Sequence, residues 1–153
     1  MSPNDDLPVR QLRLVVEAHD FEDAVRFYRD VLGLSEQAAF EGEGDERVVI
    51  FDAGRATLEL ANPAQKRMID AVEAGGHESA RIRVAFEVAD TAATTDALRD
   101  AGATVLAEPT VTPWRSLNSR LDAPAGLQLT LFQELENDEE RSARDGFGTT
   151  GER

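Results

Sequence analysis

The chain has 153 residues, a formal net charge of −14 and no cysteine, and its length suits a single domain. The excess of carboxylates argues against nucleic acid and anionic membranes as partners, because phosphate groups are bound mainly through Lys and Arg. No apolar run approaches the roughly 20 residues that span a bilayer, and the polar N-terminus does not resemble a secretory signal, so we expect a cytoplasmic protein.

The first predicted strand follows eight N-terminal residues that we expect to be disordered. Leu12, Leu14 and Val16 occupy every second position, so one face of this strand is apolar. A helix that begins after a capping Asp20 and ends at Gly33 should cover this face. The apolar residues of the helix recur at helical spacing and are Phe21, Ala24, Val25, Tyr28, Val31 and Leu32.

Short strands follow this helix, and the same order of elements then recurs. The strands predicted at residues 34–40, 47–52 and 56–61 complete a first module over about residues 9–62. Arg13, Glu17 and Asp20 reappear 70 positions later as Arg83, Glu87 and Asp90, which indicates a duplication. The second module, about residues 80–134, has a strand from Ile82, a helix between Asp90 and Gly102, and strands at 104–106, 116–122 and 127–132.

The duplication predicts an α+β fold of two βαβββ modules whose strands form a curved mixed sheet around a concave pocket. A linker helix within residues 63–79 separates the modules, since Asn62-Pro63 resembles a capped helix start. Ala64, Met68 and Val72 give this helix an apolar stripe, which ends at Gly75. It can serve as a lid over the pocket, as an arm on a partner subunit or as a plain connection. Residues 135–153 are acidic and without period, so we expect a disordered tail.

Strand alternation also predicts which side chains face the pocket. If the helices cover the face that carries Leu14, the opposite face must line the concavity. This places four side chains from four strands towards one another, namely Arg13, Glu59, Arg83 and Thr130.

Several segments are similar to those of the vicinal oxygen chelate superfamily, which includes glyoxalases, bleomycin resistance proteins and extradiol dioxygenases. The strongest match is the helix with Phe27-Tyr28 and Leu32-Gly33, and the others are Thr57-Leu-Glu59-Leu60, the strand from Arg83 to Asp90, and Asp122-Ala-Pro-Ala-Gly126. The resemblance covers roughly residues 9–134. It implies the two-module fold and a small-molecule ligand or substrate.

Metal-dependent members of that superfamily hold a divalent ion with His, Glu and similar ligands at four inward strand positions. The matching residues here are Arg13, Glu59, Arg83 and Thr130. Guanidinium groups have no lone pair to donate and stay protonated, so two of the four positions cannot ligate a metal. We therefore expect no metal and no other cofactor.

Two interpretations of the inward arginines remain open. Arg13 and Arg83 can form a fork that receives a carboxylate or another oxyanion, or they can pair with Glu59 in a closed cluster that holds the modules in register. Other candidate ligand-binding residues are Gln128 and Arg120 on the last two strands and Trp114, whose ring can stack on a planar ligand.

Three functions of different class follow. Our prediction is a metal-independent small-molecule-binding protein, like the drug-resistance branch of the superfamily, that forms a homodimer. The first alternative is a glyoxalase-like lyase or a dioxygenase relative with Glu59 as general base and arginines that stabilise an oxyanion. The second is a structural or interaction protein without a ligand. Whether the chain is an enzyme stays open.

Overall fold

The computed structural model describes residues 6–137, 139–140, 143 and 147–148. The first module contains β1 (Gln11–Glu17), α1 (Phe21–Arg26), a π-helical turn η1 (Phe27–Val31), β2 (Glu36–Glu41), β3 (Arg47–Ala53) and β4 (Ala56–Ala61). The linker helix is α2 (Pro63–Ala74). The second module contains β5 (Ile82–Glu87), α3 (Thr91–Asp100), β6 (Thr104–Val111), β7 (Ser116–Ala123), the 3₁₀ turn η2 (Pro124–Gly126) and β8 (Leu127–Glu134). A short strand, β9, covers Phe147–Gly148.

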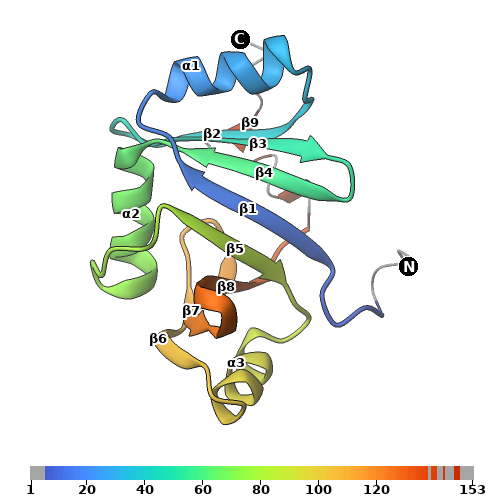
Figure 1. The fold of residues 1–153 in the computed structure, drawn as a ribbon, viewed down its shortest axis with the longest axis vertical. Helices are drawn as coiled ribbons and strands as arrows, with labels where there is room; N and C mark the ends of the chain where they lie inside the picture. The colour runs from blue at the N-terminus through green and yellow to red at the C-terminus, as the bar shows by residue number, and fades with distance from the viewer. Residues whose placement is uncertain (1–5, 138, 141–142, 144–146, 149–153) are drawn as a thin grey trace.

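The strands form one sheet in the order β6-β7-β8-β5-β1-β4-β3-β2-β9. β1 and β5 pair antiparallel at its centre and join the two modules, while β1 pairs parallel with β4 and β5 pairs parallel with β8. The sheet is strongly curved, with α1 on the outer side of one half and α3 on the outer side of the other (Figure 1). The expected α+β fold with two βαβββ modules is confirmed.

The largest difference in length between a predicted and an observed strand is that of β6, which continues to Val111 instead of ending at Leu106. Its pairing with β7 shifts register twice, between Val105 and Ala107 and between Ala107 and Thr110. Such bulges interrupt the alternation of side chains on which a prediction from sequence depends.

Each module has its own apolar core beneath its helix. In the first module, buried residues of α1 pack on the outer face of β2, β3 and β4. In the second, Val88, Leu121 and Leu131 form the core, and Leu98 of α3 packs against them. As alternation predicts, Leu58 and Leu60 point to the helix side of β4.

The helices do not cover the outer face at the centre of the sheet, where we expected them to. Val16 packs under α1 and Phe86 under α3, but Leu12 and Leu14 between them are 38% and 37% exposed. Ile82 on the neighbouring strand is 59% exposed. The curvature of the sheet carries α1 and α3 apart and leaves this strip of β1 and β5 uncovered (Figure 1).

The first helix also departs from its predicted form at both ends. The side chain of Asp20 makes no capping hydrogen bond, whereas Asp90 caps α3 by accepting from the amide of Ala93 at 3.0 Å. Near the other end, the amide of Leu32 donates to the carbonyl of Phe27, five residues back. This wider turn takes Leu32 and Val31 off the buried stripe, and both are exposed.

Most of the tail expected to be disordered lies outside the described residues, as do the first five residues of the chain. Within that tail, Phe147 and Gly148 form β9 and pair with Phe40 and Ala39 of β2. In the described part of the chain, no helix is long and apolar enough to cross a membrane.

Candidate functional site

Arg13 lies on the inner face of β1 and has carboxylates within reach from two other strands. Its Nη1 is 3.6 Å from Oε1 of Glu59 on β4, and its Nη2 is 3.8 Å from Oε1 of Glu134 at the end of β8. Its guanidinium also lies over the ring of Phe132, 4.8 Å from the centroid, and its Nε donates to Gln11 at 2.5 Å. The charge of Arg13 is therefore compensated within the protein.

Arg83 lies on the inner face of β5 in a different environment. Its side chain is buried, at 7% exposed, and its Nη1 donates to the hydroxyl oxygen of Thr130 at 2.7 Å. Among the described residues no carboxylate forms an ion pair with it. Burial of a cation beside a neutral partner is unfavourable, because one hydroxyl replaces little of the lost hydration.

The strand register explains why the predicted convergence of four residues takes this form. Val15 lies opposite Arg83 across the β1–β5 pair and opposite Glu59 across the β1–β4 pair. A valine therefore separates Arg83 from Glu59. The structure brings the four residues onto one face as two separate pairs, Arg13–Glu59 and Arg83–Thr130, and not as one Arg-Glu-Arg cluster.

A small cavity adjoins Arg83 at the end of the sheet nearest α2. Its volume is about 10 Å³, which is room for one water molecule. Its lining combines inner-face residues of the central strands with residues of α2 and of the segment before β5: Val15, Glu17, Ala61, Lys66, Ile69, Ser79, Ala80, Arg81 and Arg83. Arg81 and Ala80 are exposed and Arg83 is buried, so the lining of the cavity extends from the surface to a buried arginine.

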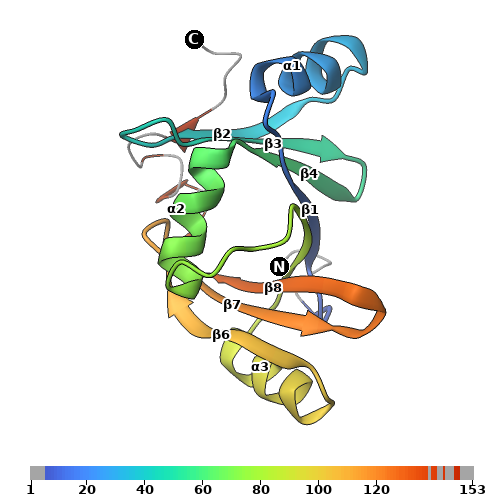
Figure 2. The same ribbon diagram turned by 60° about the vertical axis from the view of Figure 1, so that its left-hand side comes forward.

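Helix α2 begins and ends as predicted. The side chain of Asn62 accepts a hydrogen bond from the amide of Gln65 at 2.9 Å, and Gly75 ends the helix with a φ of 60°. The helix packs against β3 and β4 of one module and β6 and β7 of the other. It thus spans one open end of the curved sheet (Figure 2).

The face that α2 buries is not the predicted one. Its buried residues are mostly polar, namely Gln65, Lys66, Ile69, Asp70, Glu73 and Ala74, whereas Ala64, Met68 and Val72 are only half-buried. The reason is the polar inner face of β7. Arg120, 1% exposed, lies 3.0 Å from both Asp70 and Glu73, and Asn118 donates to Glu73 at 2.5 Å.

Asp70 is the centre of this buried network. Burial by itself would raise the pKa of its carboxyl group. The amide of Ser79 donates to the carboxylate, however, and the charges of Arg120 and Lys66 lie beside it, so the pKa is lowered overall. Asp70 is therefore charged at neutral pH and holds α2 on the second module.

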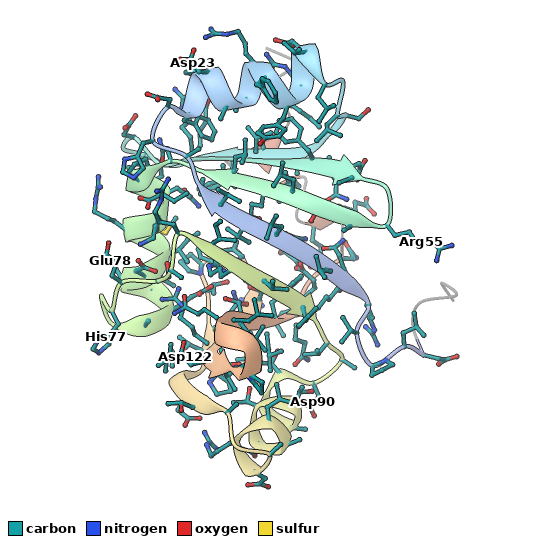
Figure 3. All side chains as sticks on the ribbon, in the orientation of Figure 1. Asp23, Arg55, His77, Glu78, Asp90 and Asp122 are labelled. Carbon is teal, nitrogen blue, oxygen red and sulfur yellow. The ribbon has the colours of Figure 1, made fainter. Side chains whose placement is uncertain are left out.

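Lys66 is the one lysine of the sequence and was not among the candidate site residues. It is 8% exposed, and its Nζ is 3.3 Å from Asp70 and 3.6 Å from Glu78. Glu78 and His77 follow α2, where Figure 3 shows them beside the end of the helix. The spacing of Lys66 and Asp70 predicts an i,i+4 pair. The sequence does not show, however, that this side of the helix packs on a polar strand, so it could not predict that Lys66 is buried.

The other predicted ligand-binding residues lie elsewhere. The oxygen of the Gln128 side chain accepts from the amide of Ala80, which braces the segment before β5. Trp114 is half-buried in the turn between β6 and β7. Arg120 is enclosed by α2 and the carbonyl of His77, which accepts from it at 3.3 Å. Of the predicted set, only Arg83 lines the cavity.

A metal ion of the superfamily type does not fit these residues. Within the described residues, no three or more His, Asp or Glu side chains lie together as potential metal ligands. At the four inward positions, the carboxylate of Glu59 is paired with Arg13, and the hydroxyl of Thr130 accepts a hydrogen bond from Arg83. A cation placed there would meet two positive charges and lose both acceptors.

Comparison with known proteins agrees with the fold. The model of the Glyoxalase/Bleomycin resistance protein/Dioxygenase superfamily matches residues 10–131, whereas no curated protein sequence matches the chain. Similar solved structures include a hypothetical protein from Bacillus halodurans C-125, at 14% identity and a TM-score of 0.63, covering 82% of this chain and 94% of that one.

Two further structures are similar over most of both chains. Methylmalonyl-CoA epimerase from Mycobacterium tuberculosis is 17% identical with a TM-score of 0.57, covering 94% of this chain and 97% of its own. A superfamily member from Vibrio splendidus 12B01 is 12% identical with a TM-score of 0.56, covering 81% and 98%. The family match extends over most of the sequence, so this chain belongs to the glyoxalase/bleomycin resistance protein/dioxygenase superfamily.

Proposed function

We propose that this chain is a metal-independent small-molecule-binding protein. The observation that carries the proposal is Arg83, a buried arginine on the inner face of β5 whose guanidinium donates to the neutral hydroxyl of Thr130 and forms no ion pair with a described carboxylate. A fold without use for such a group loses stability by burying it. A ligand group that accepts hydrogen bonds from Arg83 removes this cost when it binds.

The alternative of an enzyme with Glu59 as general base has less support. Glu59 is 3.6 Å from the Arg13 guanidinium, and it does not line the cavity beside Arg83. A base must reach the proton that it removes. Glu59 would first have to leave Arg13, which is also held by Phe132 and Gln11.

If the chain were a purely structural member of the superfamily, its interior should be closed and its buried charged groups should be paired with one another. Arg120 comes closer to that expectation: two carboxylates and a carbonyl lie around the ends of its guanidinium, and only its buried Nε has no hydrogen-bond partner among the described residues. Arg83 does not meet it. The contrast favours ligand binding at the centre of the sheet and a structural role for the α2–β7 contact.

The proposal is tested by ligand binding to metal-free protein. Purified protein is treated with a chelator, its content of divalent metals is measured, and its melting temperature is recorded against anionic, cationic and neutral organic compounds. We expect at least one class to raise the melting temperature with saturation, and the increase to persist without metal. Binding that appears only when a divalent metal is restored would contradict the proposal.

A further inference from the structure

We infer that the ligand carries an oxyanion, and that this group binds in the cavity between β1, β5 and α2, against Arg83 with Lys66 and Arg81 at its sides. The inference rests on the proposed function and assigns its ligand class and its site. Lys66 and Arg81 were not among the binding residues predicted from the sequence. The ligand class is a small organic molecule that bears a carboxylate or a comparable oxyanion.

The charges of the cavity lining favour an anion. Three cations line it, Lys66, Arg81 and Arg83, against one carboxylate, that of Glu17. Lys66 is already paired with Asp70 and Glu78. Among the buried cations of the lining, Arg83 is the one with which no described carboxylate forms an ion pair. A guanidinium binds a carboxylate through paired, charge-assisted hydrogen bonds.

The burial of the lining gives the orientation of the ligand. Arg83 and Lys66 are 7% and 8% exposed and form the inner part of the cavity, whereas Arg81 and Ala80 are exposed at its rim. The volume of about 10 Å³ is room for one water molecule, so the cavity admits one oxygen atom of the oxyanion. The oxyanion therefore enters first, and the remainder of the ligand stays at the rim beside Arg81.

The binding of an anion at this site is compatible with the negative net charge of the protein. A net charge of −14 attracts cations to the protein surface. That attraction acts at long range and is screened over about 8–10 Å at physiological salt. At the cavity, the nearby guanidinium groups determine which sign of charge is bound.

The experiment compares malonate with malonamide, which has a similar shape and no charge, by calorimetric titration of metal-free protein. We expect malonate to bind with saturation and malonamide to bind at least tenfold more weakly. Arg83→Met should weaken malonate at least about tenfold, since a hydrogen bond between charged groups contributes about that much or more. Lys66→Met should weaken it less.

The matched control is Arg55→Met. Arg55 lies in the turn between β3 and β4, on the opposite side of the molecule from α2 (Figure 3), so its loss should leave malonate affinity unchanged. Arg83→Lys keeps the charge without the planar fork and should give an intermediate affinity. It also serves as the test variant if Arg83→Met does not fold.

The possible failures can be told apart. Equal malonate affinity in wild type and Arg83→Met, or equal binding of malonamide, overturns the assignment of the oxyanion site. If a neutral or cationic compound binds metal-free protein while malonate does not, the oxyanion inference is wrong and the proposed function stands. If no compound binds without a divalent metal, both are wrong.

Discussion

The two modules share one order of elements but differ on their inner faces. On β3 of the first module, Val48 and Ile50 are apolar and pack with Ala38 and Ala61. On β7 of the second, the inner face is polar, and Arg120 receives Asp70 and Glu73 from α2. The second module thus holds a helix through charges. At the junction of the modules, Arg83 has no such partner in the described structure.

The difference teaches that a buried arginine is not by itself a sign of a binding site. Arg120 and Arg83 both point inward from neighbouring parts of one sheet, and sequence alone placed both among the ligand-binding candidates. The number of acceptors around each guanidinium separates them. Arg120 has two carboxylates and a carbonyl, and Arg83 has a hydroxyl.

The largest expected effect comes from removing the charge of Arg120. Arg120→Met leaves the buried Asp70 and Glu73 without the cation that they share, so the free energy of unfolding should fall by about 3–5 kcal/mol. Urea denaturation measures this change, with Arg55→Met as an exposed control that should stay within about 0.5 kcal/mol of wild type. A loss below 1 kcal/mol for Arg120→Met would show that α2 is not held by these charges.

The next effect depends on pH. Asp70→Asn should lower the free energy of unfolding at pH 7 by about 1–3 kcal/mol, because charge-assisted hydrogen bonds are lost. The pKa of Asp70 is lowered in the folded protein, so its contribution is present above the pKa of the unfolded chain and is lost as the pH falls through the folded value.

The stability of wild type and Asp70→Asn should accordingly converge as the pH is lowered below about 4. Urea denaturation at a series of pH values measures the difference between the two proteins. A difference that stays constant between pH 7 and pH 3 would contradict the lowered pKa of Asp70 and its role in the network.

A smaller effect compares the equivalent helix starts of the two modules. Asp90→Ala removes a capping hydrogen bond to Ala93 and should cost about 1 kcal/mol, whereas Asp20→Ala removes none and should be nearly neutral. Thermal denaturation of both variants gives the comparison. Equal losses would mean that Asp20 also caps its helix in solution.

The smallest expected effect belongs to Arg83 in the absence of a ligand. Arg83→Met removes a buried cation, which should stabilise the fold, and one hydrogen bond to Thr130, which should destabilise it. The free energy of unfolding should therefore change by less than about 1 kcal/mol. Denaturation in a buffer without carboxylates measures it. A loss as large as that of Arg120→Met would mean that Arg83 has a structural role like that of Arg120.

Much of the fold could be predicted because its signals are local. The bounds predicted for β4 agree with those observed, and Asn62 and Gly75 delimit α2 through short-range capping geometry. Alternation along single strands also placed Arg83 and Thr130 on the inner face. These features depend on neighbouring residues in the sequence, which is why sequence analysis found them.

The rest depends on contacts between distant segments. The predicted apolar stripe of α2 assumed an apolar partner, but the partner is the polar inner face of β7, so the buried face turned towards Arg120. Strand register placed Val15 between Glu59 and Arg83, which single-strand alternation cannot reveal. Lys66 was missed for the same reason, since only the docking of α2 carries it to the cavity.

The difference between the two arginines can be measured directly by NMR of protein labelled with ¹⁵N-arginine, by following the Nε–H signals during titration with malonate. The signal of Arg83 should shift and saturate, while that of Arg120, enclosed by Asp70 and Glu73, should stay in place. If the Arg120 signal responds and that of Arg83 does not, or if neither responds, the assignment of Arg83 as the ligand-binding group is wrong.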